Sequence, residues 1–165
     1  MMNSELAEIK NMIYDKCSLQ ISDFKTETES KEYEACQFEL NGLIVICRNA
    51  KTTPKKTGQF VTFWKRNAKG PIEPFHETDP IDFYVVNVQT TNQQGQFVFP
   101  KSVLIKKGII STDKKEGKRA FRVYPSWDVT NNKQAEQAQK WQLNYFYEIN
   151  NATDLKRVIE LYKNK

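Results

Sequence analysis

The stretch ACQFELNGLIVICRNA, residues 35–50, decides the fold. Its central Asn41-Gly42 pair is the preferred pair for a two-residue type I′ turn, and strand-forming residues lie on both sides of it. We therefore predict a β-hairpin whose strands cover residues 35–40 and 43–50. Apolar residues on both faces of the strand expected at 58–66 indicate that this later strand lies inside a sheet.

The register of this hairpin predicts which side chains meet across it. Cys36 falls opposite Cys47, and Phe38 falls opposite Val45. The cysteine pair occupies a hydrogen-bonded site, where the backbones are farther apart, so two buried thiols are favoured over a disulfide. The chain has three cysteines, an odd number without paired short spacing, which fits a reducing compartment and argues against a zinc site.

Further elements are predicted outward from the hairpin. Apolar residues spaced by three and four predict a helix over residues 4–17 capped by Ser4, and the polar residues 22–32 are typical of a surface loop. Strands are expected at 58–66, 81–88, 96–99 and 119–124, an irregular loop at 70–74, a short helix at 101–107, and two final helices, one from Ala135 to Ile149 and one capped by Thr153. This order predicts an α+β (mixed α/β) fold, with a five- to six-stranded mixed sheet flanked by helices in a single domain over residues 1–165.

Charge is distributed unevenly along the chain. Lysine and arginine number 25 against 20 acids, giving a net charge of +5. Acids concentrate between Glu27 and Glu34, whereas segments 48–69, 101–107 and 114–122 carry the surplus cations. This asymmetry predicts one positive face that suits an anionic or phosphate-bearing partner. Residues 1–10 contain no apolar signal core and no run is long enough to span a membrane, so we expect a cytoplasmic protein.

Cations near predicted strand ends are the candidate contacts to a nucleic-acid backbone, DNA or RNA. They are Lys51, Lys55, Lys56, Lys65, Arg66, Lys101, Lys118, Arg119 and Arg122, with Gln59 as a polar neighbour. Phe63 and Trp64 could stack on bases, but a strand that is apolar on both faces favours core positions for both rings. Trp127, in a predicted loop, is the better candidate for an exposed aromatic ring.

Catalytic alternatives find less support. The loop 53–58 lacks the spacing of a Walker loop and precedes a strand, where a nucleotide loop needs a helix. His76, the one histidine, has no nucleophile motif beside it. A divalent-metal nuclease or phosphoryl-transfer enzyme, with Mg²⁺ as its cofactor, would need Glu39 and Asp82 to converge beside a lysine, and the acid-x-lysine spacing is not evident. In a third reading, Gln59, Trp64 and Tyr124 line a pocket for a small anionic or nucleotide ligand.

Several runs of the sequence resemble the signature of the MepB family of small bacterial proteins. They are NAKTTPKKTGQFVTFWKR (49–66), GPIEPF (70–75), GQFVFPK (95–101), GKRAFRVYPSWD (117–128), KQA (133–135) and QKWQ (139–142). The resemblance covers about residues 35–148. It implies a fold similar to type II restriction endonucleases, with nucleic-acid binding suspected. The family takes its name from a member encoded beside a multidrug efflux pump and its repressor, and it supplies no established catalytic residues.

Overall fold

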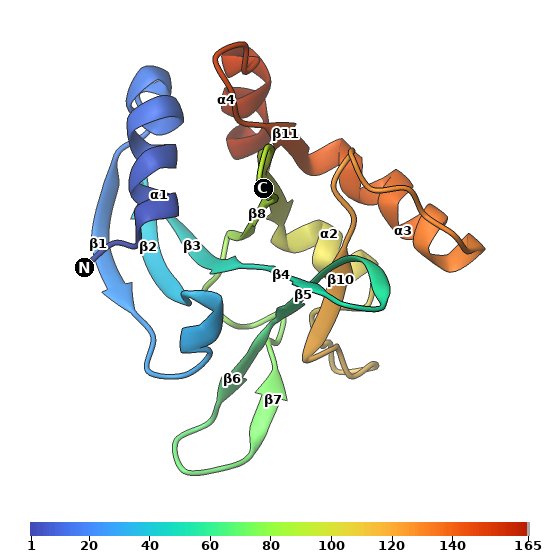
Figure 1. Ribbon diagram of the computed structural model, residues 1–165. Coiled ribbons are helices and arrows are strands. Elements are labelled where there is room, and N and C mark those ends of the chain that lie inside the picture. The colour runs from blue at the N-terminus through green and yellow to red at the C-terminus, as the bar shows by residue number, and fades with distance from the viewer. Residues whose placement is uncertain (165) are drawn as a thin grey trace.

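The computed structural model describes residues 1–164 and shows a mixed α+β fold (Figure 1). Its centre is a six-stranded sheet in the order β1-β2-β3-β8-β9-β11. The strands are β1 (Ile21–Thr26), β2 (Cys36–Leu40), β3 (Leu43–Asn49), β8 (Phe83–Gln89), β9 (Gln94–Pro100) and β11 (Phe146–Glu148). β3 and β8 are parallel and the other neighbours are antiparallel, so the predicted mixed sheet is confirmed.

Two smaller sheets extend from this centre. One has the order β10-β5-β4, built from β4 (Lys51–Thr53), β5 (Lys56–Thr62) and β10 (Ala120–Val123). The other pairs β6 (Trp64–Arg66) with β7 (Ile72–Pro74) and projects as a separate ribbon at the bottom of Figure 1.

Helices cover both faces of the central sheet. They are α1 (Ser4–Ile9), which continues as a π turn and a 3-10 turn to Cys17, α2 (Lys101–Lys106), α3 (Lys133–Gln142) and α4 (Leu155–Lys163). Side chains of α1 and α4 pack with β2 and β3 in one apolar core, whereas α2 and β5 pack on the other face. Between residues 1 and 164, no helix combines the length and apolar character needed to cross a bilayer.

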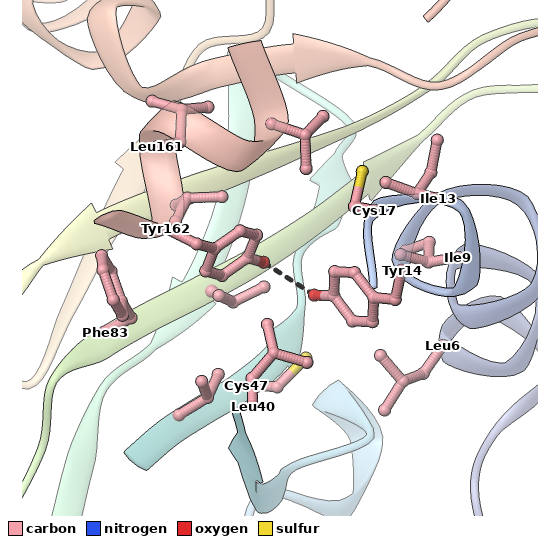
Figure 2. Close-up of a cluster of buried hydrophobic side chains, with 14 of the residues drawn as sticks. Leu6, Ile9, Ile13, Tyr14, Cys17, Leu40, Cys47, Phe83, Leu161 and Tyr162 are labelled. Carbon is pink, nitrogen blue, oxygen red and sulfur yellow. Dashed lines mark hydrogen bonds between the residues drawn. The ribbon is translucent and has the colours of Figure 1, made fainter. Parts of the chain in front are cut away.

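The first core contains a buried polar network around Gln96. Its side-chain oxygen accepts hydrogen bonds from Tyr147 and Tyr162 at 2.6 and 2.8 Å. The Tyr162 hydroxyl also lies 2.7 Å from that of Tyr14, and a dashed line marks this hydrogen bond in Figure 2. The Gln96 amide nitrogen donates to the side-chain oxygen of Asn87. Burial raises the pKa of all three tyrosines, so they remain neutral donors. The network ties the first helix, α4 and three strands together.

The central hairpin forms as the sequence predicts. Asn41 and Gly42 have φ values of 50° and 84°, as a type I′ turn requires. Cys36 pairs with Cys47 in the ladder, and both are buried free thiols. The contact with Cys36 and burial raise the pKa of the Cys47 thiol, which makes it a poor nucleophile.

Two N-terminal predictions are wrong. Residues 21–26 form the strand β1 instead of a surface loop, because edge strands tolerate polar side chains and this one pairs with β2 through a register shift. The helix cap is Asn3, whose side chain accepts from the Leu6 nitrogen at 3.0 Å, so Ser4 is the first helical residue.

Three further boundaries also differ. The strand expected at 58–66 breaks at buried Phe63, where the chain leaves β5 to pair with β7, so residues 72–74 are a strand rather than a loop. The helix expected to reach Ile149 ends at Gln142, because Phe146 and Tyr147 pair with β9. Asp154, not Thr153, caps α4.

Candidate nucleic-acid interface

A basic hollow of about 480 Å³ lies between the β4–β5 turn, β10 and α3. We define the basic hollow by the cationic and aromatic side chains that line it. These are Lys55, Lys56, Lys107, Lys118 and Arg122, together with Phe121, Tyr124 and Trp141. Its volume falls in the range of pockets that take small organic ligands or single building blocks of a polymer.

Arg122 shapes one wall of the basic hollow rather than pointing freely into it. From β10, its guanidinium donates to the carbonyl oxygens of Thr57 and Gly58 at 3.2 and 3.3 Å, and to the hydroxyl of Thr53. These bonds hold the β4–β5 turn against β10. Because Pro54 and Lys55 form that turn, Arg122 fixes the position from which the adjacent lysines reach the solvent.

Gln142 joins the opposite wall, α3, to the same strand. Its amide nitrogen donates to the Arg122 carbonyl at 2.9 Å, and its amide oxygen accepts from the Tyr124 nitrogen at 2.9 Å. Gln142 is buried, so both bonds are shielded from water. Gln139 similarly holds the loop before α3 through the carbonyls of Pro125 and Asp128. These bonds set the width of the basic hollow.

The charge lining the basic hollow is positive. Lys55, Lys56, Lys107 and Lys118 are exposed. None of these lysines is in an ion pair within the part of the chain that the structure describes. Among residues 1–164, no aspartate or glutamate lines the basic hollow. Asp128 lines a separate concavity on the other side of the turn; burial raises its pKa, and a hydrogen bond from the Gly58 nitrogen partly offsets this.

Other predicted phosphate contacts lie elsewhere and have protein partners. Lys65 is 2.7 Å from Asp79 and 3.6 Å from Glu73, while Arg66 is 2.9 Å from Glu29. Two more of the predicted cations also have protein partners. Lys101 donates to the Asp79 carbonyl at 2.6 Å, and Arg119 forms an ion pair with Glu116 at 3.0 Å. The structure therefore brings together four of the predicted cations, Lys55, Lys56, Lys118 and Arg122.

Two predicted residues occupy other environments. Lys51 is exposed on β4 with its amino group 5.1 Å from the centre of the Tyr33 ring. Gln59 is 2% exposed and donates to the Gln89 carbonyl, so its amide is structural. Of the three residues expected to line a small-ligand pocket, only Tyr124 contributes to the basic hollow; neither Gln59 nor Trp64 lines it.

The aromatic rings of the basic hollow differ in how firmly they belong to the core. Phe121 and Trp141 pack against the second core, and the Trp141 ring also lies 5.4 Å from the Lys107 amino group. Tyr124 is half-buried and belongs to neither core cluster. Trp127, expected to be exposed, is half-buried edge-on against Phe146 at 5.8 Å.

The carboxylates proposed for metal-assisted cleavage have separate structural partners. Asp82 accepts from the Ile44 nitrogen at 2.8 Å. A hydrogen bond with Asp23 and that residue's charge raise the pKa of Glu39. His76 contacts Thr78 and Asp113 in its loop. Within residues 1–164, no group of three or more His, Cys, Asp or Glu side chains is placed to hold a metal ion.

Sequence reasoning missed two residues that build this site. Lys107 lies in a segment recognised as basic, but its position just beyond α2 gave no sign that it meets α3. Gln142 lies on a helix that was predicted from its apolar stripe. The sequence around a buried glutamine does not differ in any recognisable way from the sequence around an exposed one. Only the fold identifies them.

Comparison with known proteins supports the sequence resemblance. A family model described as MepB-like matches residues 27–148. A structure titled "Crystal Structure of MepB" aligns with a TM-score of 0.79 and 34% identity, covering 90% of this chain and 99% of that one. A bacterial homing endonuclease, I-Ssp6803I, aligns at a TM-score of 0.46 and 16% identity over 85% of this chain and 86% of its own, a likeness too low to carry an argument. No curated protein sequence matches the chain.

Proposed function

The chain belongs to the MepB-like family, and we propose that it binds nucleic acids by placing their phosphates in the basic hollow. One observation carries this proposal. The cations of the basic hollow line one concave surface that contains no acid among residues 1–164, whereas Lys65, Arg66 and Arg119 each meet a carboxylate. Clustered, uncompensated lysines around a concavity create a strong local positive potential that attracts polyanions.

The cations divide into two roles in this proposal. Lys55, Lys56, Lys107 and Lys118 contact phosphate oxygens as mobile point charges. Arg122 is a positioning residue, because its donors hold the β4–β5 turn. Cleavage is not part of the proposal, since Glu39 and Asp82 have their own partners.

Salt titration with a matched pair of variants tests the proposal. Lys118 and Arg119 are adjacent and exposed, but only Lys118 lines the basic hollow. Lys118→Ala should weaken binding of a labelled oligonucleotide pool for all sequences alike and reduce the log–log salt slope by about 0.7 to 0.9. Arg119→Ala removes the same charge and an exposed ion pair of small value, and should leave the slope unchanged.

A second variant extends the test to the turn. Lys55→Ala combined with Lys56→Ala should reduce the slope about twice as much as Lys118→Ala. Binding by the wild type that does not weaken as salt rises would refute phosphate contact. Equal losses in Lys118→Ala and Arg119→Ala would show that the basic hollow is not where the nucleic acid lies.

A further inference from the structure

The positive charge of the basic hollow exceeds the negative charge that one internal nucleotide supplies. Among residues 1–164, no acid lines the basic hollow, and five cations do, namely Lys55, Lys56, Lys107, Lys118 and Arg122. Its volume of about 480 Å³ suits a single building block of a polymer. An internal nucleotide brings one phosphate diester, which carries about one negative charge. A surplus of positive charge would therefore remain beside such a nucleotide.

Arg122 belongs to this surplus although its guanidinium has hydrogen-bond partners. It donates to the carbonyl oxygens of Thr57 and Gly58 and to the hydroxyl of Thr53. All three acceptors are neutral, so these bonds fix the position of the guanidinium without compensating its charge. Arg66, by contrast, meets a carboxylate. The basic hollow consequently favours a phosphate that carries more charge than a diester.

The cationic surface continues from the basic hollow across α3. An outer hollow of about 610 Å³ shares four lining residues with it, namely Lys107, Gln134, Ala138 and Trp141. The outer hollow adds Lys140, and no acid lines it among residues 1–164. Beyond the β4–β5 turn, the separate concavity adds Asp128 to the lysines of the turn. A polyanion therefore meets lysines over α3 and a carboxyl group beyond the turn, which favours a strand that ends at the turn.

We infer that the basic hollow receives the phosphorylated end of a nucleic-acid strand, whose terminal phosphate contacts the lysines of the β4–β5 turn while the strand crosses α3 over the outer hollow. This inference rests on the proposed function and names its substrate class. A terminal phosphate monoester carries about 1.5 to 2 negative charges at neutral pH and offers three strong acceptor oxygens. A free nucleotide has the same chemical group, so the experiment compares the two sources.

Four oligonucleotide probes test the inference with the full chain. An unstructured 12-nucleotide strand is prepared with hydroxyl groups at both ends, with a 5′-phosphate, and with a 3′-phosphate. The fourth probe is the hydroxyl-ended strand extended by one nucleotide, which has as many phosphates as either phosphorylated strand but no terminal one. At one salt concentration, at least one phosphorylated strand should bind about 10-fold more tightly than the extended strand.

A free nucleoside monophosphate, measured by competition, identifies the source of the terminal phosphate. It should bind at least about 10-fold more weakly than the preferred phosphorylated strand, because it lacks the linked nucleotides that reach the outer hollow.

Two variants locate the terminal phosphate. Lys55→Ala combined with Lys56→Ala should reduce the preference for the phosphorylated strand over the extended strand to within about 2-fold. Lys140→Ala is the control in the outer hollow; it should weaken both strands by the same factor and preserve the preference of about 10-fold. All three lysines are exposed and form no ion pair within residues 1–164, and circular dichroism with thermal melting checks that each variant is folded.

The outcomes separate the inference from the proposed function. Equal affinity of both phosphorylated strands and the extended strand overturns the inference and leaves phosphate binding intact. A preference that survives the Lys55 and Lys56 substitutions also overturns it, as does a preference that Lys140→Ala abolishes. A monophosphate that binds as tightly as the phosphorylated strand overturns the strand end as the source. Failure of every probe to bind refutes the proposed function itself.

Discussion

Replacing Gly58 by alanine tests how closely β5, β10 and the Tyr124 ring are packed. Gly58 has a φ of 83°, in the left-handed region that residues with a β-carbon rarely adopt. An added β-carbon would lie 2.6 Å from Cε1 of Tyr124 and 2.9 Å from the carbonyl oxygen of Val123. The carbonyl belongs to β10, where Val123 pairs with Gln59, so relief requires the strand to shift.

Two contributions give the expected magnitude. The left-handed backbone costs an alanine about 1–2 kcal/mol. Overpacking against a ring and a strand backbone adds about 1–3 kcal/mol. Gly58→Ala should therefore lower the free energy of unfolding by about 2–5 kcal/mol. For a chain of this size, each kcal/mol shifts the melting temperature by about 2–4 °C.

Gly42 offers a matched control in the same fold. Its φ is 84°, almost the same as that of Gly58, but an added β-carbon would meet nothing within 4 Å. Gly42→Ala should therefore cost only the backbone contribution of about 1–2 kcal/mol. The difference between the two variants isolates the packing contribution at the β5–β10 contact.

Urea unfolding, monitored by far-UV circular dichroism, gives the free energy of unfolding of each variant. The slope m is compared between the variants. Gly58→Ala should also weaken oligonucleotide binding, because the new methyl group displaces the Tyr124 ring, whereas Gly42→Ala should not. Equal destabilisation of the two variants would refute the close approach at Gly58, as would a Gly58→Ala variant that is as stable as wild type.

Three further predictions concern buried or half-buried polar groups. Tyr147→Phe deletes a hydroxyl that donates at 2.6 Å to a buried amide oxygen and should lower the free energy of unfolding in urea by about 1 kcal/mol. Tyr145→Phe should cost less, because the Tyr145 hydroxyl makes no hydrogen bond with any of residues 1–164. Burial, and then the charges of nearby glutamates, raise the pKa of Glu5, so the native state favours its protonated form and stability falls as the pH rises through the raised pKa. Glu5→Gln should therefore gain stability relative to wild type as the pH rises above the ordinary pKa of a glutamate, and a difference independent of pH would contradict this. Gln142→Leu leaves a buried backbone donor and acceptor without partners and should cost about 2–4 kcal/mol by the same assay, together with reduced oligonucleotide binding; unchanged binding would show that Gln142 does not position the hollow.

Local patterns with a strong physical cause were predictable from the sequence. The Asn41-Gly42 turn fixes the hairpin, and a period of two then fixes the Cys36–Cys47 register. Strands with weak patterns were not predictable. β1 is an edge strand whose polar residues face solvent, and β11 follows a helix without a breaking residue, so pairing with distant strands decides both.

The sequence identified the cations but could not assign their partners. Lys118 and Arg119 are adjacent, yet one lines the basic hollow and the other pairs with Glu116. Arg66 meets Glu29, which lies 37 positions away in the chain. Charge spacing predicts a positive surplus on a segment, whereas neutralisation depends on which segments the fold places side by side.

The lysines of the basic hollow give the isolated fold no electrostatic benefit. Lys55, Lys56 and Lys118 share one concavity that no acid of the described residues 1–164 lines, so they repel one another in the folded state more than in the extended chain. Screening by salt reduces that repulsion, and a bound polyanion reverses it. A nucleic acid that occupies the basic hollow must therefore raise the free energy of unfolding by the same linkage that gives its affinity. The same lysines consequently disfavour the empty fold and favour the bound one, whereas an acid-paired cation such as Arg66 does neither.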